Sequence, residues 1–136
     1  MGRGDNWLSQ FTTPLVMDKI GEKEWILLKT FEYHVGCYPS TEIIIVPEGF
    51  HTDLASIPKI FWPILPPDGP YGKAALVHDY CYRFACYNRK RSDEIFLEGM
   101  EVLKVEEWKQ TTMFHSVRLF GWHAWNKRRK EQYEHG

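Results

Sequence analysis

The chain has 136 residues, of which 43% are hydrophobic and 15% aromatic, and is expected to bury one core as a single domain over residues 1–136. Its 17 basic and 18 acidic residues nearly cancel, so net charge gives no strong signal for nucleic-acid binding. Three cysteines are an odd number, which argues against a disulfide framework and favours a reducing compartment. The start lacks the apolar core of a signal peptide, and the uncharged stretch 60–67 is too short to span a bilayer. We therefore expect neither secretion by a signal peptide nor a transmembrane segment, and the oligomeric state stays open.

The N-terminal part of the chain has the pattern of a small antiparallel sheet. After a flexible N-terminus over residues 1–12, aromatic and β-branched runs within residues 15–46 favour strands. Gly21 and the segment 36–40 mark turns, so hairpins between sequential strands are expected. The four runs are 15–16, 25–28, 31–35 and 43–46.

A proline-rich segment over residues 47–72 follows and is predicted to be an irregular loop. Proline removes a backbone donor and fixes φ, so regular structure there is limited to one short helical turn near 57–62. Loops with so much rigid punctuation are frequent carriers of function.

Residues 73–130 have helical spacing and predict about three packed helices, followed by a tail over 131–136. The first helix covers 73–87, with an apolar stripe that ends at Phe84. Ser92 is expected to cap the second helix after a basic turn over 88–91. The third helix runs from 105 or 106 to about 130, with Gly121 as a bend or close-packing point. Its predicted apolar faces contain Trp108, Val117, Leu119 and Trp122. The fold class is therefore α+β: a small N-terminal antiparallel sheet, a Pro-rich loop and then the helices.

The pair His78-Asp79 in the first helix is the strongest chemical feature of the sequence. Adjacent helical residues point about a hundred degrees apart, so the two side chains must serve different partners. A histidine that activates water beside an aspartate that binds a divalent cation would use both. Asp93 lies fifteen residues after His78, on the apolar side of the second helix, and can return beside His78.

The segment 75–82 resembles the active-site helix of secreted phospholipases A2, whose motif reads His-Asp-x-Cys-Tyr. It is also similar to the shorter form in parvovirus capsids, where a following helix supplies an aspartate in a context like that of 92–96. The resemblance implies that His78 is the general base, Asp79 a calcium ligand, Asp93 the carboxylate that orients the imidazole and Tyr82 an orienting hydroxyl. The glycine-rich calcium loop of that family is matched only in part by 68–72, and its paired cysteines are missing.

A longer resemblance covers roughly residues 15–125. The segments 49–58, 74–80 and 117–121 are similar to a family of small tailed-phage and prophage proteins that is catalogued as a domain of unknown function. This implies a phage context, in the host cytoplasm or the virion, but no activity. Within the first segment Thr52, Asp53 and Ser56 form a polar cluster, and Asp53 is the candidate for a second metal ligand or a partner of His78.

Each of these residues also has a structural interpretation. A mid-helix histidine is often a packing residue, and a carboxylate in the first turn of a helix stabilises its dipole by about 0.3–1 kcal/mol. Asp53 with Ser56 could cap a short turn. Cys81 and Cys86 are expected to pack rather than to bind metal, and the basic runs 89–91 and 127–130 to be solvated.

Two further functions compete with a lipid esterase. His51, His78, Asp79 and Asp93 have the order of ligands found in metal-dependent phosphohydrolases. Alternatively the protein is not an enzyme, and the Trp- and Pro-rich segment 61–67 docks onto a phage or host protein.

Overall fold

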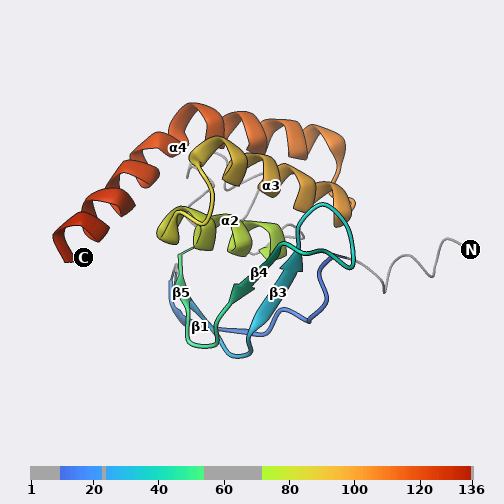
Figure 1. The fold of residues 1–136 in the computed structure, drawn as a ribbon, viewed down its shortest axis with the longest axis horizontal. Coiled ribbons are helices and arrows are strands. Elements are labelled where there is room, and N and C mark those ends of the chain that lie inside the picture. Colours follow the sequence, from blue (N-terminus) through green and yellow to red (C-terminus); the bar gives the residue numbers. More distant parts are fainter. Residues whose placement is uncertain (1–9, 23, 54–71, 136) are drawn as a thin grey trace, which may run out of the picture. The chain divides into compact units, whose positions relative to one another are not determined.

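The computed structural model describes residues 10–22, 24–53 and 72–135 (Figure 1). Strands come first in the chain and helices follow, so the predicted α+β class is confirmed. The chain forms two compact units, Met1–Asp53 and Leu54–Gly136, each of which is described by itself. The predicted helical turn at 57–62 and the segment 61–67 lie outside the described residues.

The first unit holds two small antiparallel sheets. One has the strand order β1-β2-β5 and the other pairs β3 with β4. The strands are β1 (Met17–Gly21), β2 (Glu24–Leu27), β3 (Phe31–His34), β4 (Ile43–Val46) and β5 (His51–Thr52).

Two of the predicted sequential pairings are confirmed, but β2 pairs with β5 rather than with β3. The physical reason lies at Gly49, which has a φ of 92°, a conformation that glycine adopts without a Cβ penalty. The chain turns there and bonds back to β2, through Gly49 N to Leu27 O at 2.8 Å and Leu27 N to Phe50 O at 2.9 Å. The two residues of β5 were predicted as loop because so short a strand has no readable alternation.

The core of the first unit follows the two-residue period of its strands. In β4, Ile44 and Val46 are buried whereas Ile43 and Ile45 are exposed, as expected for side chains that alternate across a sheet. Phe11 bridges to Tyr33, and their rings pack in a tilted arrangement with centroids 4.5 Å apart. Local alternation therefore decides which side chains fill this core.

The second unit packs three helices against one another: α2 (Gly72–Phe84), α3 (Arg89–Val102) and α4 (Glu107–His135). Helix α2 is buried over most of its circumference, because nine of its thirteen residues are buried. Its predicted stripe fails only at Phe84, which is exposed at the helix end. Figure 1 shows the C-terminal turns of α4, in red, extending past the ends of α2 and α3.

The predicted start of the second helix was wrong. Asn88, not Ser92, is the N-cap of α3, and its side-chain oxygen accepts a hydrogen bond from Arg91 N at 2.7 Å. The basic residues 89–91 therefore form the first helical turn. Ser92 is buried, and its hydroxyl donates to Asn88 O at 3.0 Å.

The predicted apolar face of the third helix was also wrong in part. Val117 is buried, but Trp108, Leu119 and Trp122 are exposed. Helical periodicity identifies stripes of apolar residues, and α4 has more apolar residues than α2 and α3 cover. The helix continues to His135, five residues beyond the predicted end. Among the described helices, none has the length and the apolar character needed to cross a membrane.

Candidate active site

A buried carboxylate, that of Asp93, lies at the centre of the second unit. Its Oδ1 is 2.7 Å from His78 Nε2 and accepts a hydrogen bond from the Tyr82 hydroxyl, also at 2.7 Å. Its Oδ2 accepts a hydrogen bond from Arg118 Nη1 at 2.6 Å. Asp93 is fully buried and His78 nearly so. We call the residues His78, Tyr82, Arg89, Asp93 and Arg118 the Asp93 cluster.

Helix geometry explains how His78, Tyr82 and Asp93 meet. His78 and Tyr82 are four residues apart on α2, so both side chains lie on the same helix face. Asp93 is the fifth residue of α3 and projects inward from its second turn, not from the first turn where it would serve the helix dipole. The His78 ring is held between the rings of Tyr82 and Phe96, with centroids 4.2 and 4.7 Å away.

The surroundings of Asp93 favour its ionised form. Burial by itself raises the pKa of this carboxyl, but the hydrogen bonds from His78, Tyr82 and Arg118 outweigh burial and bring the pKa below 3.8. Burial, followed by the hydrogen bond to Asp93 and its negative charge, raises the pKa of Tyr82 well above 10. The Tyr82 hydroxyl therefore keeps its proton and donates it to a carboxylate.

Arg89 and Arg118 are the members of the cluster that sequence reasoning missed. Arg89 Nη1 lies 3.6 Å from Asp93 Oδ2 and donates to Val117 O at 3.0 Å, which ties α3 to α4. Arg89 is half-buried, so the expectation that the run 89–91 is solvated was wrong for this residue. For Arg118, the sequence did contain a clue to this role. The segment 117–121, which resembles the phage family, has Arg118 between two apolar residues.

Gly121 allows α4 to approach the cluster closely, as its predicted packing role implied. A Cβ at this position would lie 2.6 Å from the Tyr82 hydroxyl and 3.3 Å from Arg89 Nη1. Only glycine leaves room for both side chains at this crossing. The absence of a side chain at Gly121 therefore allows the Tyr82 hydroxyl to occupy its position.

A cavity of about 270 Å³ opens beside His78. It lies between α2 and α4, and both polar and apolar side chains line it. Its lining from α2 is His78, Asp79 and Tyr82, and from α4 it is Ser116, Val117, Phe120, Gly121, His123, Ala124 and Arg128. The His78 ring is therefore both bound to a buried carboxylate and adjacent to a space that a small group can enter.

Asp79 is the one residue of this described lining with a carboxylate, and it is buried. Calcium takes about six to eight oxygen ligands, so Asp79 would supply one ligand, and others would have to come from water, substrate or residues beyond this lining. Among the residues that the structure describes, no group of three or more His, Cys, Asp and Glu side chains is arranged to hold a metal ion. The direct His78–Asp93 bond leaves no space for a metal ion between these two groups.

The remaining predicted site residues belong to the first unit or lie outside the described residues. Thr52 is buried and His51 exposed in β5, and Asp53 follows them with intermediate exposure. The structure does not relate these three residues to the Asp93 cluster. Ser56 lies outside the described residues.

Comparison with known proteins places the chain in a family. Residues 25–117 match the family described as "Protein of unknown function (DUF1353)". The chain belongs to the DUF1353 family. The match takes in all of α2 and α3, with His78, Tyr82 and Asp93, and ends one residue before Arg118.

This DUF1353 chain also resembles a protein of Sinorhizobium fredii with the name "Uncharacterized protein y4jT". The two are 36% identical over 78 residues, which is 56% of this chain and 23% of that protein. The chain thus spans about a quarter of the length of this curated relative. No solved structure matches the chain.

Proposed function

We propose that this protein is an ester hydrolase with chemistry like that of phospholipase A2 and with His78 as its general base. The observation that carries the proposal is the 2.7 Å contact between His78 Nε2 and the buried Asp93 carboxylate, in the wall of a cavity. A histidine held in this way by a carboxylate is the arrangement by which many hydrolases orient an imidazole and stabilise its charged form.

The reaction would begin with a water molecule next to the His78 ring. Because Nε2 is bonded to Asp93, the ring would take the proton of this water at Nδ1 while the oxygen attacks the ester carbonyl. Asp93 would stabilise the imidazolium that forms, and Tyr82 and Arg118 hold the carboxylate in place. General-base catalysis of this kind contributes typically 10²–10⁴-fold to a rate.

The lining of the cavity supports a lipid ester as substrate. Val117, Phe120 and Ala124 offer an apolar wall for an acyl chain, and Arg128 supplies a cation for an acidic headgroup. The resemblance to tailed-phage proteins supports a phage context, in which membrane phospholipids of the host are the accessible esters. The protein would then act in the host cytoplasm or from the virion.

Asp79 is the proposed ligand of a divalent cation, calcium in the phospholipase A2 resemblance. A bound cation would polarise the ester carbonyl. Asp79 lines the same cavity as His78, which supports this role. Asp53 stays a proposed second ligand.

The test is fatty-acid release from phospholipid vesicles by the full chain, with and without calcium. We expect release by the wild type and a loss of at least about 100-fold in His78→Asn, because asparagine cannot act as a base. The matched control is Lys90→Ala, an exposed position on α3 that is expected to keep full activity. Equal rates for the wild type and His78→Asn, or no release under either condition, would rule out the hydrolase.

A non-enzymatic interaction protein is the second candidate, and the surface of α4 favours it. Leu119, Phe120 and Trp122 are 65%, 54% and 48% exposed, and Trp122 stacks on His123 with ring centroids 3.6 Å apart. Apolar side chains gathered on one helix are common in interfaces with a protein partner. A phage or host protein bound here would be released by Leu119→Ser with Trp122→Ser, whereas His78→Asn would leave its binding unchanged.

A further inference from the structure

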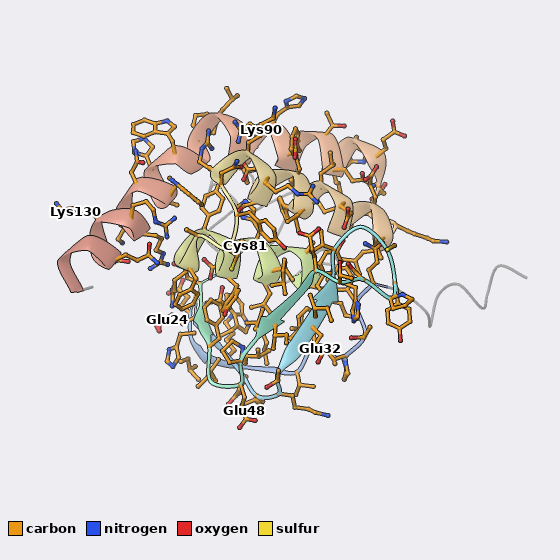
Figure 2. The ribbon with its side chains drawn as sticks, viewed as in Figure 1. Glu24, Glu32, Glu48, Cys81, Lys90 and Lys130 are labelled. Atoms are coloured by element: carbon orange, nitrogen blue, oxygen red, sulfur yellow. The ribbon has the colours of Figure 1, made fainter. Side chains whose placement is uncertain are left out.

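The end of α2 brings two cysteines together. The helix ends at Phe84, and Ala85 has a left-handed φ of 49°. In helix ends of this kind, the chain reverses direction at the left-handed residue. Cys81 lies in the last turn of α2 before this reversal and Cys86 directly after it, and an interaction between the two thiols shifts the pKa of both. Figure 2 shows Cys81 on α2.

The two thiols differ in access and in charge. Cys86 is exposed and Cys81 is fully buried. The hydrogen bond from Cys81 lowers the pKa of Cys86 to about 7, so part of Cys86 is a thiolate at neutral pH. The same hydrogen bond, together with burial, raises the pKa of Cys81, which stays protonated as the donor.

We propose that Cys86 and Cys81 form an oxidation site for hydroperoxides, in which exposed Cys86 reacts first and buried Cys81 then closes a disulfide. An exposed thiolate beside a second thiol is the arrangement that supports reversible thiol oxidation. A disulfide needs Cα atoms roughly 4.4–6.8 Å apart, a separation that two residues on either side of a helix-end reversal can reach. This inference is independent of the proposed hydrolase.

The chemistry takes two steps. The Cys86 thiolate attacks the terminal oxygen of a hydroperoxide, the O–O bond breaks, and the leaving alkoxide takes a proton from solvent, which leaves Cys86 as sulfenic acid. The Cys81 sulfur then attacks the Cys86 sulfur and displaces hydroxide, which combines with the Cys81 proton to form water. In sum, two thiols and one hydroperoxide give a disulfide, an alcohol and water, so the sulfurs lose two electrons and the peroxide gains them.

The disulfide would close around a segment that carries part of the Asp93 cluster. Tyr82 follows Cys81 directly, and its hydroxyl donates to Asp93. Arg129 Nη2 already holds this helix end, through hydrogen bonds to Tyr82 O at 2.6 Å and Arg83 O at 2.8 Å. The cross-link therefore forms on a helix end that α4 keeps in position.

The experiment uses the reduced full chain, treated with hydrogen peroxide, then unfolded in urea, alkylated with iodoacetamide and examined by intact mass and peptide mapping. We expect loss of two hydrogen atoms, loss of alkylation at Cys81 and Cys86, and recovery of both with dithiothreitol. In Cys81→Ala, Cys86 should instead form a dimedone adduct of its sulfenic acid. In Cys86→Ser, Cys81 should stay reduced because it is buried.

Cys37→Ser is the control, since Cys37 belongs to the first unit and should not alter the product. Two results would overturn the proposal. One is wild-type protein in which Cys81 and Cys86 both remain alkylated after peroxide. The other is a dimedone adduct at Cys86 of the wild type with Cys81 still a free thiol.

Discussion

At the scale of single residues, the buried Asp93 carboxylate is held by contacts from two helices, α2 and α4. A buried carboxylate is costly unless charged and polar groups compensate it, and here His78, Tyr82 and Arg118 each supply a contact within 2.7 Å. The arginine completes the compensation that the two α2 residues begin. Removal of the Arg118 side chain should therefore lower the free energy of unfolding and also change the position of the Asp93 carboxylate.

Arg118→Met tests this role of the arginine. Methionine keeps much of the apolar stem but leaves Asp93 Oδ2 without its 2.6 Å donor, so we expect a loss of about 1.5–3 kcal/mol of unfolding free energy, measured by urea denaturation. The matched control is Arg91→Met, whose 3.8 Å pair with Glu94 is exposed and should contribute about 0–1 kcal/mol. Equal effects of the two variants would show that the contact with Asp93 adds no stability.

The His78, Tyr82 and Asp93 positions were accessible from sequence because helical spacing and a short motif both encode them. Arg89 and Arg118 were not, because a long basic side chain in a helix is usually solvated, and only the packing of α4 shows that these two turn inward. Asp53, Ser56 and His51 stay predictions, since nothing in the described structure relates them to His78. The part of the site that could be predicted from sequence is therefore the group of residues on α2 and α3.

At the scale of elements, the crossing of α2 and α4 decides the geometry of the Asp93 cluster. Gly121 is a point of close approach, and the nearest atom to a Cβ there would be the hydroxyl that binds Asp93. A methyl group cannot be accommodated unless Tyr82 moves. The position of α4 is therefore coupled to the hydrogen bonds of the site.

Gly121→Ala should lower stability by about 1–3 kcal/mol through overpacking and should reduce hydrolysis to the level of Tyr82→Phe. The double variant Gly121→Ala with Tyr82→Phe lacks the hydroxyl in conflict, so its loss of stability should be smaller than the sum of the two single losses. Asn126→Ala, on the exposed face of α4, is the control and should be neutral. Strict additivity in thermal or urea unfolding would contradict the proposed contact.

The elements also show where local patterns stop being informative. Strands β2 to β4 were predicted closely because they are aromatic and β-branched runs between turn residues, whereas β5 is a strand through its pairing with β2. In α4, exposed Leu119 and Trp122 cannot be told from core residues by spacing, because the periodic stripe is wider than the surface that α2 and α3 cover. The observed structure differs from the predictions at β5 and α4 because tertiary packing, rather than local sequence preference, determines the structure there.

At the scale of the whole molecule, the Asp93 cluster makes stability depend on pH in a definite direction. The pKa of Asp93 in the folded protein lies below 3.8, so its ionised form binds its partners more strongly than a free carboxylate would. Its contribution to folding is complete above about pH 5, where an unfolded aspartate is almost fully ionised, and is lost as the pH falls through the lower folded pKa.

Asp93→Asn should therefore be less stable than the wild type at pH 7, by about 3 kcal/mol, because removing one partner leaves buried charge uncompensated. This difference should shrink as the pH is lowered below about 5, because the unfolded carboxyl and then the folded one take up a proton. Urea unfolding at a series of pH values measures it. A difference that stays constant as the pH falls would mean that folding does not lower the pKa of Asp93.

The proposed hydrolase requires that Nε2 of His78 carries a proton, which it donates to Asp93. Nδ1 of the same ring is then able to act as the base. A long-range ¹H–¹⁵N correlation spectrum of the ¹⁵N-labelled full chain, assigned with His78→Asn, reads this directly. For the neutral ring of His78 we predict a protonated Nε2 and an unprotonated Nδ1, with the preference weakened in Asp93→Asn. A neutral ring with its proton on Nδ1 and none on Nε2 would contradict the account.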